Sequence, residues 1–331
     1  MVRGSRLPFA LLFLIPMALA GSGPQQEALL EAARRAYEAS EYPKAVEVLQ
    51  EAAAKDPKNG EIQLLLAKSY LELQQHDAAI RSAEKAVEID PRNSVYHEWL
   101  GRAYGEKADH SGWFATKMSF AKKTGKEFET AVELDGKNFS ARQALVEFDC
   151  SAPGMLGGGE DKAQRHIKEL MEMDRAEGHF ASGNCRRQKK DFAEADEEFA
   201  QSLENHPKSA ELIYDIGDYA IKRGQPERLM VVAEVGDRAA PNDPRGRFYR
   251  GVELVLKEEK PEEAERLLQE YAKKAPKRNG FPTSAAAHAW LGRLYESQKR
   301  TRDATREFES ALQLDPKNKM AQEWLKKVKK G

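Results

Sequence analysis

A helix-stopping motif recurs along this chain at a nearly regular interval. Its four clearest copies are Asp56-Pro57-Lys58-Asn59, Asp90-Pro91-Arg92-Asn93, Asp135-Gly136-Lys137-Asn138 and Asp315-Pro316-Lys317-Asn318. Proline cannot continue a helix but fits the first turn of the next one, so each copy predicts a helix end and a new start. With looser copies, the series of anchors is Pro57, Pro91, Gly136, Arg175, Pro207, Pro241, Pro276 and Pro316. Their spacings of 34, 45, 39, 32, 34, 35 and 40 residues indicate a period of 34 with three expansions.

Equivalent places in each period carry side chains of equivalent size. Twelve residues before the anchor, six of the eight periods have alanine: Ala45, Ala79, Ala163, Ala195, Ala264 and Ala304. Eight residues before it, every period is apolar: Leu49, Ala83, Phe128, Ile167, Phe199, Ala233, Leu268 and Phe308. A small residue also recurs where two helices would approach closely, at Ala33, Ala67, Gly101, Gly183, Gly217, Gly251 and Gly292. Such a pattern predicts one helix pair, repeated.

These residues resemble the tetratricopeptide repeat (TPR) family. The best match is the last unit, with Leu291, Gly292, Tyr295, Ala304, Phe308, Ala311 and Pro316. The resemblance covers about residues 26–318 and departs in units four and six, where Val146 and Leu229 replace the small residues. It implies an all-α fold, an α-solenoid of about eight helix pairs in a right-handed superhelix, with a concave face built mainly from first helices. Because end units need a polar cover, residues 319–331 are predicted to form a C-terminal capping helix.

The first twenty residues are interpreted as a cleavable signal peptide. Arg3 and Arg6 precede a mostly apolar run from Leu7 to Leu19, which ends in the small-x-small sequence Ala18-Leu19-Ala20. The run is too short for a standard membrane span, although an uncleaved anchor is the alternative. The solenoid is therefore assigned to residues 21–318. We expect a periplasmic or secreted protein of bacterial type with no membrane span after cleavage.

Two of the expansions fall inside helix pairs of consecutive units. The first, within residues 105–128, predicts a long second helix from about Trp113 to Leu134; the second, at residues 151–160, adds a glycine-rich loop. Both should lie on one edge of the superhelix, which would gather four apolar residues: Trp113, Phe114, Met155 and Leu156. The favoured interpretation is that helix and loop bury these groups locally. The alternative is an apolar binding patch.

The concave face offers two further candidate surfaces. Family geometry places a basic row there, Arg34, Lys68 and Arg102, beside an acidic row, Glu38, Glu72 and Glu106. Pairing of each base with the glutamate four residues on would make an ordinary solvated ladder, whereas a groove for an acidic peptide is the alternative. In unit seven, Phe248, Val252, Val255 and Leu256 make the inner face apolar. They would hold a hydrophobic segment or be covered by the next unit.

Chemical motifs are lacking. Seven histidines show no metal-ligand spacing, so no metal site is expected. The glycine-rich loop lacks the pattern of a phosphate cradle and is interpreted as a flexible loop, and no nucleophile elbow is present. Cys150 and Cys185 fall near the ends of neighbouring first helices, where a disulfide is conceivable, although two separate buried thiols are favoured. With 53 basic and 54 acidic residues, no nucleic-acid partner is expected.

The sequence therefore predicts a non-catalytic scaffold without cofactors. It would bind a protein or peptide partner in the cell envelope. The alternative is a substrate-holding accessory subunit or chaperone of an envelope enzyme or secretion system.

Overall fold

The computed structural model describes residues 24–329, and its regular structure in this range is entirely helical. The predicted signal peptide lies outside the described residues. The helices are α1 (Pro24–Glu38), α2 (Tyr42–Lys55), α3 (Gly60–Glu72), α4 (His76–Ile89), α5 (Ser94–Asp109), α6 (Phe114–Leu134), α7 (Phe139–Ser151), the 3₁₀ helix η1 (Gly154–Leu156), α8 (Glu160–Met173), α9 (Arg175–Lys189), α10 (Phe192–Glu204), α11 (Ala210–Arg223), α12 (Pro226–Ala239), α13 (Arg245–Lys257), α14 (Pro261–Lys274), α15 (Ser284–Ser297), α16 (Thr301–Leu314) and α17 (Lys319–Val328).

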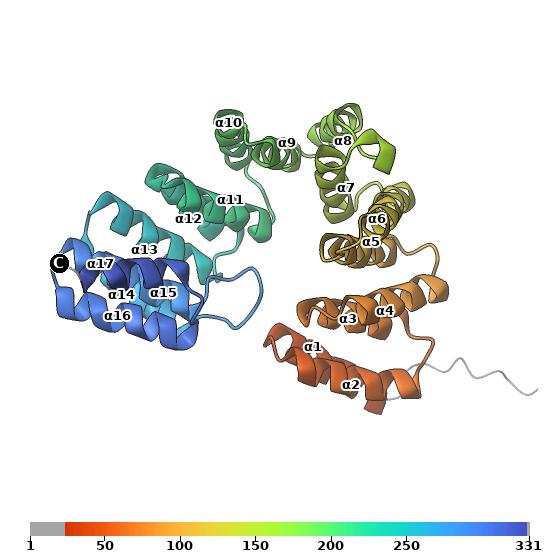
Figure 1. Ribbon diagram of the computed structural model, residues 1–331, viewed down its shortest axis with the longest axis horizontal. Coiled ribbons are helices and arrows are strands. Elements are labelled where there is room, and N and C mark those ends of the chain that lie inside the picture. The colour runs from red at the N-terminus through yellow and green to blue at the C-terminus, as the bar shows by residue number, and fades with distance from the viewer. Residues whose placement is uncertain (1–23, 330–331) are drawn as a thin grey trace, which may run out of the picture.

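Helices α1 to α16 form eight consecutive pairs, and each helix packs against the next along the chain. Between α10 and α11 the contact is made by side chains, with the ring centroids of Phe199 and Tyr219 4.8 Å apart. Figure 1 shows the pairs following an open ring, with α1 and α2 at one end and α15 to α17 at the other. The all-α solenoid implied by the resemblance is thus confirmed. Over residues 24–329, no helix combines the length and the apolar character needed to cross a membrane.

The recurrent motif works through its asparagine and aspartate. Asn59, Asn93, Asn138 and Asn318 are N-caps whose side-chain oxygens accept backbone N–H groups of the following helix. The aspartate accepts the N–H two residues on, at 3.1 Å for Asp90 and 3.0 Å for Asp315. The prolines lie before the N-cap, in the turn, rather than in the first helical turn as we expected. Proline therefore ends one helix while asparagine starts the next.

The predicted small positions are sites of close helix contact. A Cβ added at Gly101, Gly183 or Gly292 would lie 2.5–2.7 Å from the ring of Phe128, Phe199 or Phe308, eight residues before the anchor. Beside each contact, a histidine on the first helix meets a glutamate on the second: His97–Glu127, His179–Glu198 and His288–Glu307, at 2.7–2.8 Å. Units three, five and eight thus share one packing module.

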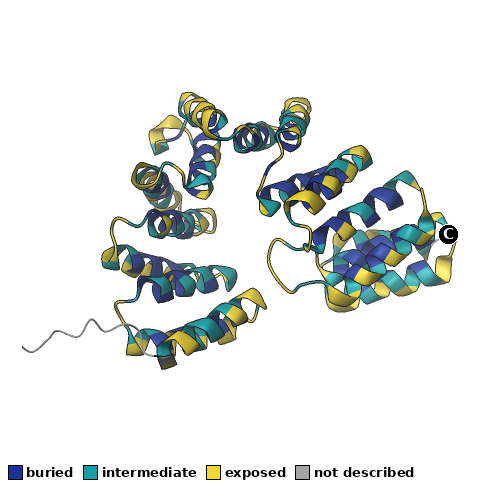
Figure 2. Cartoon of the chain, turned by 180° about the vertical axis from the view of Figure 1, so that it is seen from behind, coloured by how far each residue is buried: buried dark blue, intermediate teal, exposed yellow. Residues whose placement is uncertain are grey.

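The six alanines twelve residues before the anchor are fully buried. Figure 2 shows the buried faces turned toward neighbouring helices, with exposed residues on the outer surfaces. At the C-terminal end, α17 packs Met320, Trp324 and Val328 against the core. Its lysines Lys326 and Lys327 are exposed. This helix covers the last pair as a capping helix should.

The two expansions within helix pairs are a lengthened helix in unit three and a loop in unit four. Helix α6 runs from Phe114 to Leu134, and its first half extends beyond the length of a usual second helix to contact η1. The loop after α7 is not featureless, because it contains η1 and closes with a hydrogen bond from the Gly159 N–H to the Asp149 carbonyl oxygen, 2.9 Å long. Gly157 and Gly159 have φ values of 101° and 131°, a region that favours glycine.

Candidate protein-binding groove

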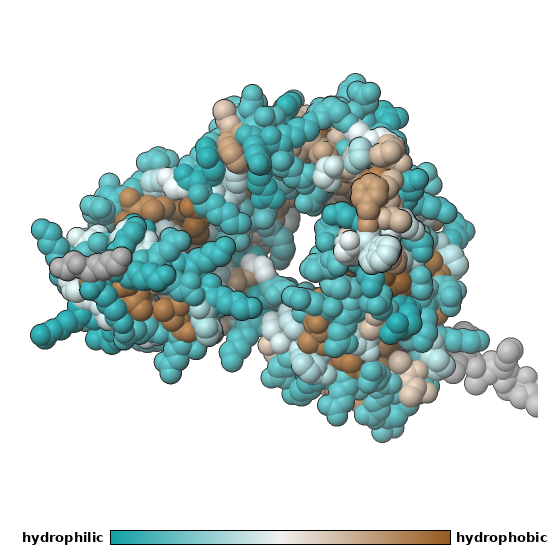
Figure 3. Space-filling model, viewed as in Figure 1, coloured by the Kyte–Doolittle hydropathy of each residue, from teal (hydrophilic) through white to brown (hydrophobic). Residues whose placement is uncertain are grey.

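A cavity of about 930 Å³ lies on the inner side of units two to five. Its walls are first helices α3, α5 and α7, the start of α6 and the loop carrying η1. Trp99, Phe128, Phe148 and Leu156 supply apolar lining, and Glu72, Arg102, Glu106, Lys117 and Glu147 supply charges of both signs. Figure 3 shows the hollow at the centre of the molecule. A cavity with apolar walls and a few charged groups suits an amphipathic segment.

The loop between α14 and α15, residues 275–283, closes one side of this groove. The guanidinium of buried Arg245 on α13 donates to the Gly280 carbonyl oxygen at 3.1 Å and lies 4.2 Å from the ring centroid of Phe281. Next in the loop, the Asn279 side chain donates to the Glu72 carboxylate on α3. Unit seven therefore holds a loop that contacts unit two, 207 residues away in the sequence. Figure 1 shows this loop pointing across the ring toward the N-terminal helices.

The basic row on the concave face is organised around Trp99. The Lys68 ammonium lies 4.4 Å from the indole centroid, and the Arg102 guanidinium lies 5.4 Å from it. Burial lowers the pKa of Lys68. Arg102 also pairs with Glu98 on its own helix at 3.0 Å, and Arg34 pairs with Glu31 and Glu61.

The expected ladder, in which each base pairs with the glutamate four residues on, is therefore wrong, because other carboxylates and an aromatic face hold these cations. The sequence analysis did not predict that Trp99 belongs to this surface. Its position three residues before Arg102 could have indicated it, because residues at this spacing are neighbours on a helix.

The three glutamates of the acidic row have different surroundings. Glu38 is exposed. Glu72 contacts Asn279, and burial is the first cause of the raised pKa of its carboxyl group, with the nearby charge of Glu106 adding to it. Burial likewise raises the pKa of Tyr37, which lies beside Glu72. Glu106 lies close to His76 and His110. Two carboxyl groups of the acidic row, Glu72 and Glu106, therefore line the groove where units two and three meet.

The apolar edge is exposed, so local burial, the favoured interpretation, is wrong. Trp113, Phe114 and Met155 have exposed fractions of 80%, 76% and 70%, and Leu156 is half-buried and lines the cavity. Helix α6 contacts η1, but this contact leaves Trp113, Phe114 and Met155 largely exposed. Figure 3, in the same view as Figure 1, shows exposed apolar side chains over the region of α6 and the loop before α8. Three large exposed apolar groups beside a cavity are typical of a binding surface.

The apolar inner face of unit seven offers no binding surface. Phe248 and Val252 are 2% and 0% exposed. The ring of Phe248 packs against Tyr271 of α14, with centroids 5.1 Å apart. These two candidate residues belong to the core, because the second helix of the unit and the following unit cover them.

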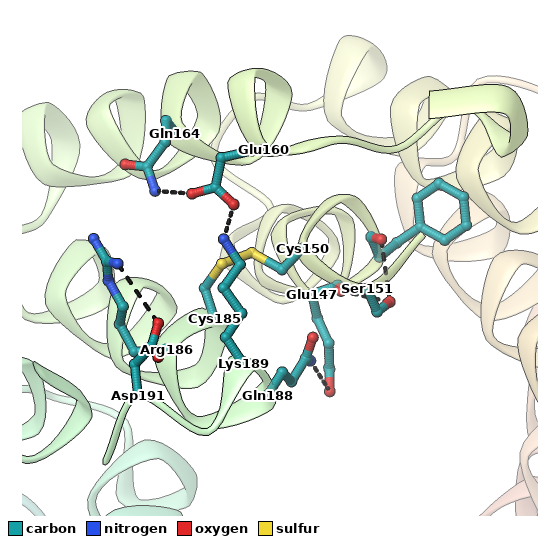
Figure 4. The surroundings of a disulfide bond; sticks show 11 residues. Glu147, Cys150, Ser151, Glu160, Gln164, Cys185, Arg186, Gln188, Lys189 and Asp191 are labelled. Carbon is teal, nitrogen blue, oxygen red and sulfur yellow. Dashed lines mark hydrogen bonds and ion pairs between the residues drawn. A yellow bond between two sulfur atoms is a disulfide. The ribbon is translucent and has the colours of Figure 1, made fainter. Parts of the chain in front are cut away.

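Cys150 and Cys185 form a disulfide between α7 and α9, with Cα atoms 5.6 Å apart. The preference for two separate thiols was wrong, because the first helices of units four and five lie close enough for the sulfurs to bond. In Figure 4 the disulfide lies among polar groups, with Glu147 and Gln188 hydrogen-bonded at 3.2 Å on the side that lines the groove. Lys189 and Glu160 form an ion pair nearby. The disulfide therefore fixes the wall helix α7 to α9, which contributes Gln188 to the lining of the groove.

The structure also gathers residues that no sequence spacing indicated. His76 at the start of α4 stacks on His110 at the end of α5, with ring centroids 4.6 Å apart. Glu106 joins them from the same face of α5. Asn279 likewise comes to the groove from the far end of the chain.

Comparisons with known proteins agree with the repeat assignment. Models of the tetratricopeptide repeat match residues 36–103 and residues 285–318. These matches in the first and last parts of the solenoid support the TPR family. No curated protein matches the chain.

Among solved structures, yeast Tom70 is similar at a TM-score of 0.58 and 14% identity, over 94% of this chain and 66% of Tom70. A thermophilic TPR protein from Thermus thermophilus is 19% identical over 56% of this chain and 94% of its own, at a TM-score of 0.47. A TPR protein from Parabacteroides merdae is 14% identical over 92% of this chain and 99% of its own, at a TM-score of 0.42. The likeness to Tom70 shows the α-solenoid fold.

Proposed function

We propose that this chain is an exported scaffold of the cell envelope that binds a protein or peptide partner in the groove of units two to five. The observation that carries the proposal is the convergence of both internal expansions on that groove. Lys117 and Ala121 of the lengthened α6 line the cavity, as do Pro153 and Leu156 of the loop with η1. The added residues thus build one wall and leave Trp113 and Phe114 exposed beside it.

Protein binding is also the role that the repeat matches support, since TPR proteins bind protein partners and are generally non-catalytic. The groove combines an aromatic side chain, Trp99, with two cations that lie against its ring. Aromatic and arginine side chains are the residue types that most often carry binding energy at interfaces. We therefore expect Trp99, Arg102, Trp113 and Phe114 to contribute most to the partner's affinity.

The proposal of export rests on two features. The first is the N-terminal pattern interpreted as a signal peptide. The second is the Cys150–Cys185 disulfide, because disulfides form and persist mainly in oxidising compartments. A periplasmic or secreted location satisfies both.

The test is affinity purification of the full chain, tagged at its C-terminus, from native envelope extract. Trp113→Ser with Phe114→Ser removes the apolar edge, and Arg102→Glu reverses a groove charge. The matched control is Met230→Ser with Leu314→Ser, which removes exposed apolar residues from α12 and α16, outside the groove. We expect a stoichiometric folded partner that is recovered with the wild type and the control and is reduced at least about tenfold by both groove variants.

Equal recovery with all variants would contradict the groove as the binding site. Recovery of many unfolded clients instead of one folded partner would favour the alternative role as a substrate-holding subunit or chaperone. Location is tested separately by fractionation, since a chain that retains residues 1–20 in the cytoplasm would contradict export.

A further inference from the structure

The cluster of His76, Glu106 and His110 has the composition of a transition-metal site. Each residue offers one ligand atom, and these atoms all lie within 4.8 Å of one another. In a tetrahedral Zn²⁺ site with bonds of about 2.0–2.2 Å, donor atoms lie roughly 3.4 Å apart. Modest rotations of the three side chains therefore bring the donors to coordinating distance.

The backbone supports this arrangement. Glu106 and His110 are four residues apart at the end of α5, so they share one helix face. His76 begins α4 in the preceding unit. The same two helices are joined next to the cluster by an ion pair between Lys107 Nζ and Asp77 Oδ1, 2.8 Å long.

Hydrogen bonding prepares the imidazoles for coordination. His110 Nδ1 lies 2.9 Å from the backbone carbonyl oxygen of Glu106. A carbonyl oxygen only accepts, so His110 Nδ1 carries the proton and Nε2 presents a lone pair; metal-binding histidines are commonly oriented in this way. His76 Nδ1 is buried and has no hydrogen-bond partner within residues 24–329. An unpartnered buried nitrogen calls for an additional ligand.

We propose that His76, Glu106 and His110 bind a Zn²⁺-class ion at the boundary of units two and three. Two imidazoles and one carboxylate suit a borderline transition metal rather than Mg²⁺ or Ca²⁺, which take oxygen ligands. Three protein ligands leave a coordination position open. Because Glu106 and His110 line the groove, that position is reached from the groove, where water or a partner's side chain fills it.

The test is titration of the full chain with Zn²⁺ near neutral pH, in competition with a chromophoric zinc chelator. We expect one ion per chain with a dissociation constant of about 1 μM or lower. His76→Ala, His110→Ala and Glu106→Gln should each weaken binding at least about tenfold. Co²⁺ should bind with the visible spectrum of a tetrahedral nitrogen and oxygen site, and this spectrum should disappear in the same variants.

The matched controls are His179→Ala and Glu198→Gln, which break a 2.8 Å histidine–carboxylate contact that involves a single histidine. Both controls should keep the wild-type affinity. The proposal is overturned if the wild type takes up no Zn²⁺, if the cluster variants bind as the wild type does, or if the controls weaken binding equally. Circular dichroism checks that each variant is folded, and His110→Gln replaces His110→Ala if the alanine variant is not.

Discussion

Asp149 is a single carboxyl group whose surroundings set a pH response. Its side chain, on α7, is 1% exposed, and neither carboxyl oxygen has a hydrogen-bond partner in the described part of the chain. His166 Nε2 is 3.7 Å from Oδ2. Burial is the main cause that raises the pKa of Asp149 to about 7; Lys162 and Arg165 oppose the rise and Glu129 adds to it. An uncharged acid is the form that such a site tolerates.

We expect Asp149 to contribute a loss of stability as pH rises from about 4 to about 7. In that window Asp149 is protonated in the folded chain and ionised in the unfolded chain, whose aspartates have a pKa of about 3.9, so folding becomes less favourable with rising pH and then levels off. Asp149→Asn should remove this contribution of roughly 2–4 kcal/mol. Denaturant unfolding of both proteins at pH values across the window measures it; parallel pH profiles would contradict the assignment.

At the scale of helices, the pairs of units three, five and eight are each fixed by one aromatic ring against one glycine. A Cβ on Gly292 would lie 2.5 Å from Cε1 of Phe308, which is fully buried on α16. The ring has no free space to move into because the alanines around it, including Ala304, are also fully buried. Glycine at this place therefore sets the distance between α15 and α16.

Gly292→Ala should destabilise the chain despite the better helix propensity of alanine. Propensity favours alanine by about 1 kcal/mol, but overpacking a full core costs about 1–3 kcal/mol, so we expect a net loss of up to about 2 kcal/mol. Gly112→Ala is the matched control, because an added Cβ there meets nothing within 4 Å. Thermal unfolding by circular dichroism compares the two; an unchanged midpoint for Gly292→Ala would show that the pair can separate freely.

Across the whole molecule, buried side chains are unevenly distributed. Over residues 24–329, one large cluster extends from Ala195 to Ala321, whereas the N-terminal units hold four smaller ones. The Cys150–Cys185 disulfide joins α7 to α9, next to the start of the large cluster. In a solenoid, stability passes only between neighbours. The disulfide therefore links the N-terminal units, with their small clusters, to the unit in which the large cluster begins.

Cys150→Ser with Cys185→Ser should lower stability by about 2–4 kcal/mol, because the disulfide closes a 35-residue segment of the unfolded chain. We also expect the wild type to unfold in one thermal transition and the variant in two, with the N-terminal units unfolding first. Differential scanning calorimetry of the wild type, the variant and the reduced wild type measures this. One unchanged transition in all three would show that packing alone couples the halves.

The sequence by itself determined the helix pairs. Stop motifs, small residues and buried alanines act within one unit or between adjacent units, so a period of 34 residues records them directly. The same local information located the long α6 and the capping helix. It also placed Trp113 and Phe114 at the edge, although their exposure depended on whether the loop with η1 would cover them.

Only the tertiary structure decided which distant groups meet. The third expansion is visible as a 40-residue spacing, yet nothing local says that its loop carries Asn279 to Glu72. The stacking of His76 on His110, the position of Trp99 beside two cations and the burial of Phe248 likewise depend on how units are rotated against each other. That rotation is the sum of many small packing contacts, and no single residue in the repeat encodes it.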